Sequence, residues 1–294
     1  LHRLKSLIIL SVILIFVITP MLIKNKNIFD VEKISFDCKK NCENFLGIQS
    51  PLLIEDKKYF LLPTHFNPSP GRELWTNTLI KFIKKHFQRN SGELYEGTIS
   101  DFYPIAVQNI EAKNSYTEKN RTQALKLAEI LETKEGFDLN EAKKYINLKQ
   151  FVRFWAMESL LGFWDGYTNN QNNYYAYSNP NDQKRFHFIP WGADGAFTKG
   201  RGPFGKFGGD ENHPNSVYSQ SMLANRLFQS DEVKALYKTT MVDILKNVWD
   251  ENEIIADIKR IQAFTMDHLH SRQNRLDEGA GKLITFVENR RSDI

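Results

Sequence analysis

The sequence predicts an α+β fold, in which a short N-terminal part containing β-strands precedes a largely helical C-terminal region. The composition is that of a globular protein, with 41% hydrophobic and 25% charged residues among 294. A strand pair is expected within residues 173–190, and from residue 215 to the end the pattern is wholly helical. We expect three parts: a targeting segment at 1–27, a linker with short strands at 28–72, and one domain at 73–294.

The clearest physical signal is the apolar segment at residues 7–23, which basic residues flank on both sides. In a helix, about 17 residues at about 1.5 Å each reach about 26 Å, a little short of a bilayer core of about 30 Å. The segment is typical of an uncleaved signal anchor or a cleaved signal peptide, with a buried core helix as a third interpretation. We therefore expect a membrane-anchored protein with an extracytoplasmic domain, or a secreted one if the signal is cleaved.

The charge distribution argues against a nucleic-acid partner. The chain carries 39 basic and 35 acidic residues, a formal net charge of +4. Four basic residues lie in the first 27 positions, where no acidic residue occurs: Arg3, Lys5, Lys24 and Lys26. Because 39 minus these 4 leaves 35 basic residues against 35 acidic ones, the rest of the chain is formally neutral and does not attract a polyanion.

The first half of the chain alternates short strands with helices. Two short apolar runs around a charged turn at residues 52–62 indicate a hairpin, and a Pro-rich break ending at Gly71 follows it. Apolar residues recur at helical spacing in residues 73–87, which predicts an amphipathic helix. Strands are then expected at 94–97 and 105–107, and further helices at 121–131 and 139–148.

The second half centres on an apolar helix and a hairpin. The helix is expected at residues 151–163, and Asp165 follows just beyond its C-terminal end. An Asn-rich turn then leads to strands at 173–177 and 185–190, and the second strand runs into Asp194. The two acidic residues therefore flank an Asn cluster and a hairpin.

This arrangement has the residue types that phosphoryl transfer needs. Carboxylate and amide oxygens bind Mg²⁺ while leaving positions for substrate phosphates, and a separate Asp must accept the proton of the acceptor hydroxyl. In protein kinases a metal-binding Asn follows the base Asp by about five residues, and a second metal-binding Asp lies farther along the chain. Asp165 and Asn170 have that spacing, Asp194 closes the hairpin, and Asn173 is an equally good ligand. The alternative is that the Asn cluster only forms a turn.

The central motifs resemble those of the CotH kinase family, the atypical kinases of the spore-coat protein H type. The resemblance covers roughly residues 75–292, and its main motifs, FWDGY, NNYYAY and FHFIPWGAD, lie at 163–167, 172–177 and 186–194. It implies a reduced protein-kinase-like fold with a helical C-terminal lobe. It also implies an enzyme that transfers phosphate from ATP to Ser or Thr of envelope or coat proteins with Mg²⁺ or Mn²⁺.

The resemblance further implies roles for individual residues. Asp165 would be the catalytic Asp that orients and deprotonates the acceptor hydroxyl. Asp194 would hold the metal ion, with Asn173 or Asn170 as the second ligand. Lys113 is a candidate for the lysine that holds the phosphates of ATP, and a solvated surface lysine is the alternative interpretation. For Asp165 and Asp194 the alternative is a structural role, such as bonding the next turn.

Two departures from the family pattern favour a second hypothesis. Many members carry Asp where this chain has Gly192, and the segment that resembles the nucleotide-binding strands of the family is not found before residue 73. The alternative function is therefore a catalytically inactive, kinase-like binding module of the cell envelope. A third hypothesis is metal-dependent hydrolysis of a phosphate ester or glycan by the same Asp and Asn residues.

Overall fold

The computed structural model describes residues 53–54, 57–58, 71–133, 136–198, 217–266 and 276–294. Contacts between residues divide the chain into two compact units, one of Ser69–Asn247 with Ile294, and one of Leu1–Pro68 with Val248–Asp293. The apolar segment at 7–23 and most of the expected linker lie outside the described residues, so the targeting segment and the domain boundaries stay predictions. No helix within the described ranges is long and apolar enough to cross a membrane.

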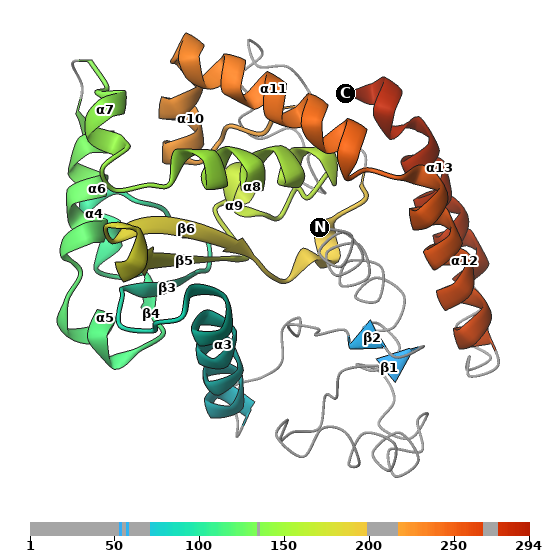
Figure 1. Ribbon diagram of the computed structural model, residues 1–294, viewed down its shortest axis with the longest axis horizontal. Coiled ribbons are helices and arrows are strands. Elements are labelled where there is room, and N and C mark those ends of the chain that lie inside the picture. Colours follow the sequence, from blue (N-terminus) through green and yellow to red (C-terminus); the bar gives the residue numbers. More distant parts are fainter. Residues whose placement is uncertain (1–52, 55–56, 59–70, 134–135, 199–216, 267–275) are drawn as a thin grey trace. The chain divides into compact units, whose positions relative to one another are not determined.

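A four-stranded antiparallel sheet forms the centre of the Ser69–Asn247 unit, and its occurrence beside many helices confirms the α+β class (Figure 1). Tyr95 pairs with Ala176, and Ala176 pairs in turn with Phe188. The strands expected at 94–97, 173–177 and 185–190 are therefore confirmed. In sheet order the strands are β4 (Glu111–Ala112), β3 (Leu94–Gly97), β5 (Tyr174–Asn179) and β6 (Arg185–Pro190).

Helix α8 (Leu148–Leu160) covers one face of this sheet. Because successive side chains of a strand point to opposite faces, the directly paired residues Ala176 and Phe188 share the face toward α8. The ring of Phe188 lies 4.9 Å from that of Phe151 in an edge-to-face arrangement, and only 1% of its surface is exposed. This helix corresponds to the one expected at 151–163, but it begins and ends three residues earlier.

Helix α3 (Gly71–Phe87) covers the opposite face and confirms the amphipathic helix expected at 73–87. Figure 1 shows α3 and α8 on opposite sides of the sheet. The buried α3 residues Leu79 and Ile83 join one apolar cluster with four residues of the strands: Leu94, Tyr175, Tyr177 and Ile189. The sheet therefore has two apolar faces, which explains why β5 is buried along its whole length.

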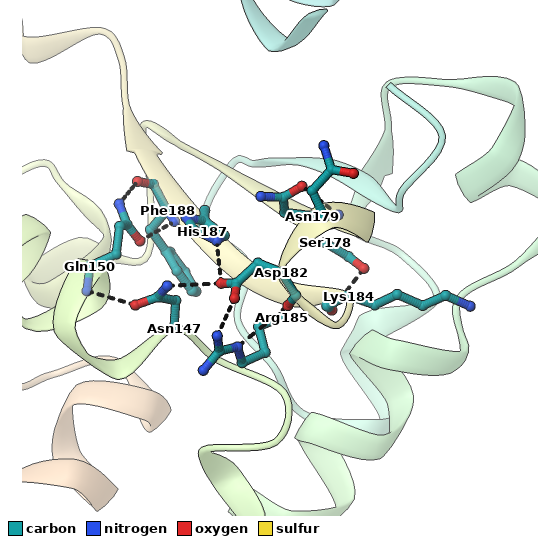
Figure 2. Close-up of polar contacts among 10 residues, drawn as sticks. Asn147, Gln150, Ser178, Asn179, Asp182, Lys184, Arg185, His187 and Phe188 are labelled. Carbon is teal, nitrogen blue, oxygen red and sulfur yellow. Dashed lines mark hydrogen bonds and ion pairs between the residues drawn. The ribbon is translucent and has the colours of Figure 1, made fainter. Parts of the chain in front are cut away.

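Polar groups attach the start of α8 to the free edge of β6 (Figure 2). The Gln150 side chain donates from Nε2 to the carbonyl of Phe188 at 2.6 Å, and its Oε1 accepts from the N–H of Phe188 at 2.9 Å. Asn147 donates its backbone N–H to the carbonyl of Phe186 at 3.0 Å, and its side chain caps α8 by accepting from the N–H of Gln150. A side-chain amide and a short backbone segment thus take the place of a further strand at this edge.

Asp182 joins the tip of the β5–β6 hairpin to the same helix start (Figure 2). Its carboxylate accepts from Asn147 Nδ2 at 2.8 Å, contacts Nε2 of His187 at 2.8 Å, and forms an ion pair with Arg185. Partial burial raises the pKa of Asp182, but the three hydrogen-bonding side chains outweigh burial and hold the pKa below its usual value. The hairpin is therefore fixed to α8 at its tip as well as along its edge.

Two expectations about the first half are wrong. Residues 105–107 belong to helix α4 (Pro104–Val107), because Pro104 occupies the first helical position, where its fixed φ and missing N–H suit a helix. Residues 139–148 do not form one helix. Helix α7 (Leu139–Ala142) covers only the start of this range, and the Asn147 cap begins α8, so the segment between them is free to pair with β6.

The remaining expectations for the described elements are confirmed. The helix expected at 121–131 is α6 (Thr122–Glu132), which the short helix α5 (Ser115–Lys119) precedes. The hairpin expected at 52–62 is formed by two short antiparallel strands, β1 (Leu53–Ile54) and β2 (Lys57–Lys58).

Every described element after residue 217 is a helix, as the sequence predicts. In the first unit, α11 packs on α8, where the Trp155 ring lies 4.7 Å from that of Tyr237. In the second unit, Arg291 of α13 pairs with Glu251 at the start of α12, and the two helices pack together. The bounds of these helices are Met222–Phe228 for α10, Asp231–Asn247 for α11, Glu251–Met266 for α12 and Leu276–Asp293 for α13.

We expect Phe188→Ala to lower the free energy of unfolding by about 3–5 kcal/mol, because it leaves a cavity between α8 and the sheet. Urea denaturation followed by tryptophan fluorescence measures the change. Ile105→Ala is the control: Ile105 is 87% exposed, so the expected change is within about 0.5 kcal/mol. Equal losses in the two variants would contradict the packing described above.

Candidate functional site

Asp165 lies in the turn between α8 and the short helix α9 (Tyr167–Asn170). Helix α8 ends at Leu160, and Gly162, with φ at +59°, turns the chain back. Glycine reaches this left-handed region without steric cost, so the turn favours glycine at position 162. The Asn-rich segment after α9 then leads into β5, which brings the Asn side chains back to Asp165.

Three side-chain amides surround the Asp165 carboxylate. Asn170 Nδ2 donates to Oδ1 at 2.6 Å, and Asn172 Nδ2 donates to the same oxygen at 3.1 Å. Asn173 Nδ2 donates to Oδ2 at 2.9 Å and to the backbone carbonyl of Asp165 at 3.0 Å. The structure therefore brings together Asp165, Asn170 and Asn173, which the sequence singled out, and adds Asn172.

The amide groups present nitrogen to Asp165, so their oxygens are directed away from the carboxylate. The oxygen of Asn172 is buried and has no hydrogen-bond partner among the described residues. A buried carbonyl oxygen without a donor is costly, and such groups in proteins often meet an ion or a water molecule. Amide and carboxylate oxygens are also the ligands that Mg²⁺ and Mn²⁺ prefer, so this donor set fits a divalent cation.

Asp194 lies in the short 3₁₀ turn η2 (Ala193–Gly195) that follows β6, and its side chain is exposed. Two glycines allow this turn to approach the Asp165 cluster. A Cβ at Gly195 would lie 3.1 Å from Cβ of Asp165, and a Cβ at Gly192 would lie only 2.8 Å from Oδ1 of Asn173. Gly192 also has φ at +58°, so any side chain at this position would strain the backbone and displace Asn173.

The candidate metal site beside Asp165 is not a cluster of carboxylates alone. Nowhere in the described ranges do three His, Cys, Asp or Glu side chains lie close enough together to hold a metal ion. The residues that could hold one are Asp194 and the amide oxygens of Asn173 and Asn172, beside Asp165. Asn170, at the end of α9, donates to Asp165 in the same way, so its amide oxygen also points away from that carboxylate, and its part as the alternative metal ligand stays a prediction.

Lys113 lies at the opposite edge of the sheet from Asp194. It directly follows β4, the outermost strand on that side, whereas Asp194 follows β6 on the other. Its ammonium group forms ion pairs with Glu96 and Glu111, and 12% of its side chain is exposed. Lys113 is thus paired with two glutamates, and the structure does not bring it into the Asp165 cluster.

Two buried carboxylates that the sequence did not assign to the site support its backbone. Asp101 accepts from the N–H of Phe102 at 2.7 Å, from Oη of Tyr167 at 2.7 Å and from the N–H of Met222 at 2.6 Å. Glu158, on the last turn of α8, contacts the residues that follow Asp165. Burial raises the pKa of both, and it raises that of Glu158 to about 7. For Glu158, its place within the apolar run of α8 was a sequence signal.

The sequence of the chain matches a family model described as CotH kinase protein over residues 78–294. The chain belongs to the CotH kinase family. The match includes the Asp165 cluster, the Asp194 turn, the whole four-stranded sheet and the described helices after residue 217.

Three fungal proteins of Rhizopus delemar are similar to part of this CotH-family chain. Invasin CotH3 is 29% identical over 121 residues, and spore coat protein homolog 1 is 32% identical over 111 residues. Invasin CotH2 is 27% identical over 121 residues. The matched segments cover 39%, 35% and 39% of this chain, and 20%, 18% and 20% of those proteins. The chain therefore matches about a fifth of the length of these relatives.

We expect Gly192→Ala to lower the free energy of unfolding more than Gly136→Ala does. Both glycines have positive φ, so each substitution costs about 1–2 kcal/mol of backbone strain. At Gly192 the new Cβ collides with Asn173, whereas no atom of the described residues lies within 4 Å of a Cβ at Gly136. Chemical denaturation of both variants, with and without Asn173→Ala, measures the difference. The extra loss at Gly192 should disappear when Asn173 is truncated, and its persistence would contradict the collision.

The pH dependence of stability should reveal Glu158. Its folded-state pKa, about 7, lies above the usual 4.5, so its contribution is fully present below pH 4.5 and is lost as the pH rises through 7. Relative to Glu158→Gln, the free energy of unfolding of the wild type should fall by about 3 kcal/mol across this range. Asp101 is common to both proteins and does not affect the difference. If the free energies of unfolding of the wild type and Glu158→Gln, measured by denaturation from pH 4.5 to 8, change with pH in parallel, the raised pKa of Glu158 is refuted.

Proposed function

We propose that the chain is a phosphotransferase that moves phosphate from ATP to Ser or Thr of envelope or coat proteins with a divalent metal ion. One observation carries this proposal: an Asp carboxylate is held by three Asn amides beside a turn that bears a second Asp. Membership of the CotH kinase family supports the same reaction class and a kinase-like arrangement of lobes.

Asp165 has the geometry of a residue that accepts a proton. Its Oδ1 already accepts two amide hydrogen bonds, whereas Oδ2 accepts the one from Asn173. Oδ2 therefore has the greater capacity for the hydroxyl proton of a Ser or Thr acceptor. The amides fix the carboxylate, so that it is oriented before the acceptor arrives.

The amide oxygens of Asn173 and Asn172 and the carboxylate of Asp194 would hold Mg²⁺ or Mn²⁺. The ion would neutralise the charge of the nucleotide phosphates. For Lys113, a part in phosphate binding stays a proposal that rests on the resemblance alone, because Glu96 and Glu111 already neutralise it.

The names of the relatives support a location and an acceptor class for this chain. Two of them are named invasins and one is named a spore coat protein homolog. Together with the apolar segment at residues 7–23, these names support an extracytoplasmic place, at a cell surface or in a coat, for this chain. Ser-rich or Thr-rich proteins of that surface are then the acceptors.

A second function, a catalytically inactive binding module, has a specific observation in its favour. No side chain at position 192 can lie beside Asn173 without moving it, so the carboxylate that many members carry there is both absent and sterically excluded. Asp194 would be the one carboxylate left for the metal ion.

Labelled ATP with Mn²⁺ or Mg²⁺ and a Ser-rich acceptor protein tests the proposal on the full chain. We expect Asp165→Ala to lower the transfer rate by about 10²–10⁴-fold, as loss of a general base does. Asp194→Ala should shift the metal concentration that is required. Asp231→Ala is the matched control, since its side chain is 97% exposed and distant in sequence from the site.

The other outcomes identify the alternatives. Release of free phosphate without an acceptor would replace transfer by hydrolysis. Absence of labelling by a folded wild-type protein, with metal and nucleotide at saturation, would refute the kinase and favour the binding module.

A further inference from the structure

Glu158 is a buried acid that the proposed chemistry does not use. It lies on the last turn of α8, seven positions before Asp165, and 2% of its surface is exposed. Burying a carboxylate is costly unless hydrogen bonds replace its lost water. Burial raises its pKa to about 7, against the opposing effect of the hydrogen bonds from Thr168 and Tyr167. Such a residue needs an explanation beyond packing.

Three hydrogen bonds of Glu158 all go to the first residues of α9. Oε1 accepts from the N–H of Tyr167 at 3.0 Å. Oε2 accepts from the N–H of Thr168 at 2.8 Å and from Oγ1 of the same residue at 2.6 Å. The first N–H groups of a helix have no partner within the helix, and a side chain just before it normally accepts from them.

Gly166 cannot supply that cap, because the N-cap residue of α9 has no side chain. A Cβ on Gly166 would lie 2.5 Å from Oε1 of Glu158, so the glycine is required for the carboxylate to reach the helix start. Glu158 and Gly166 are thus complementary: the missing cap is provided by a residue of another helix.

The capped helix connects two residues of the site. Asp165 directly precedes Gly166, and Asn170 is the last residue of α9, whose amide returns to Asp165. The orientation of α9 therefore decides whether Asn170 meets the carboxylate. The Thr168 carbonyl also accepts from the N–H of Gln220, so the same turn anchors the segment before α10.

We propose that Glu158 is a positioning residue, which caps α9 from α8 and thereby holds Asn170 against the carboxylate of Asp165. Its part in catalysis rests on the proposed function, whereas its part in positioning does not. A Gln at 158 would be cheaper to bury, but it would turn an NH₂ group toward a backbone N–H and lose one acceptor.

The test compares four variants of the full chain by NMR. Glu158→Gln removes an acceptor oxygen, and Thr168→Val removes only the hydroxyl donor, whereas Thr168→Ser retains it. Glu93→Gln is the matched control: Glu93 is also a buried acid that accepts from two backbone N–H groups at a helix start, those of Gln123 and Ala124 in α6.

In the Glu158→Gln protein, hydrogen exchange of the Tyr167 and Thr168 amides should accelerate by about 10- to 100-fold. The side-chain amide signal of Asn170 should shift toward that of a solvated Asn. Thr168→Val should produce a smaller change of the same kind, and Thr168→Ser should resemble the wild type. The Glu93→Gln protein should show faster exchange in α6 and an unaltered Asn170 signal.

Where transfer activity is present, Glu158→Gln should lower kcat by about tenfold with KM for ATP unchanged, and Thr168→Ser should keep the activity that Thr168→Val loses. An unaltered Asn170 signal in Glu158→Gln, or an equal shift in Glu93→Gln, would overturn the proposal. If the wild type transfers no phosphate, the proposed function fails, and the exchange and Asn170 signals still decide the role of Glu158.

Discussion

The attachment of α8 to the edge of β6 determines where both acidic residues of the site lie. Gln150 binds the backbone of Phe188 with both ends of its amide, and Asn147 and Asp182 fix the helix start to the hairpin. Asp165 follows the far end of that helix, and Asp194 follows the far end of that strand. A slip of the strand by one residue would turn Phe188 away from α8 and carry the Asp194 turn away from Asp165.

Buried acids at helix starts recur through the Ser69–Asn247 unit. Glu93 accepts from the first turn of α6, Asp101 from the first residue of α10, and Glu158 from the first turn of α9. In each case the acid belongs to a different segment from the helix that it caps. Such contacts satisfy the unpaired N–H groups at a helix start and at the same time connect two segments that are far apart in sequence. They orient helices more tightly than apolar packing alone.

The sequence predicted those features that depend on local pattern. Period-two and helical spacing located β5, β6, α3 and α6, and the spacing of Asp165 and Asn170 within an Asn cluster identified residues that do meet. The errors have local causes as well: Pro104 begins a helix where apolar residues indicated a strand. The contacts of Glu158 and the ion pair of Lys113 with Glu96 depend on segments that meet only in the fold, so no pattern along the chain reveals them.

Asp101 has a consequence for how the chain is made. Its carboxylate joins segments that are far apart in sequence, since Tyr167 lies 66 residues and Met222 lies 121 residues further along. During synthesis on a ribosome, which adds about 5–20 residues per second, the acid must wait for its last donor until most of this unit has emerged. Until then a charged group destined for the interior stays in water. The contact between Asp101 and α10 can therefore form only after the chain has been made through Met222.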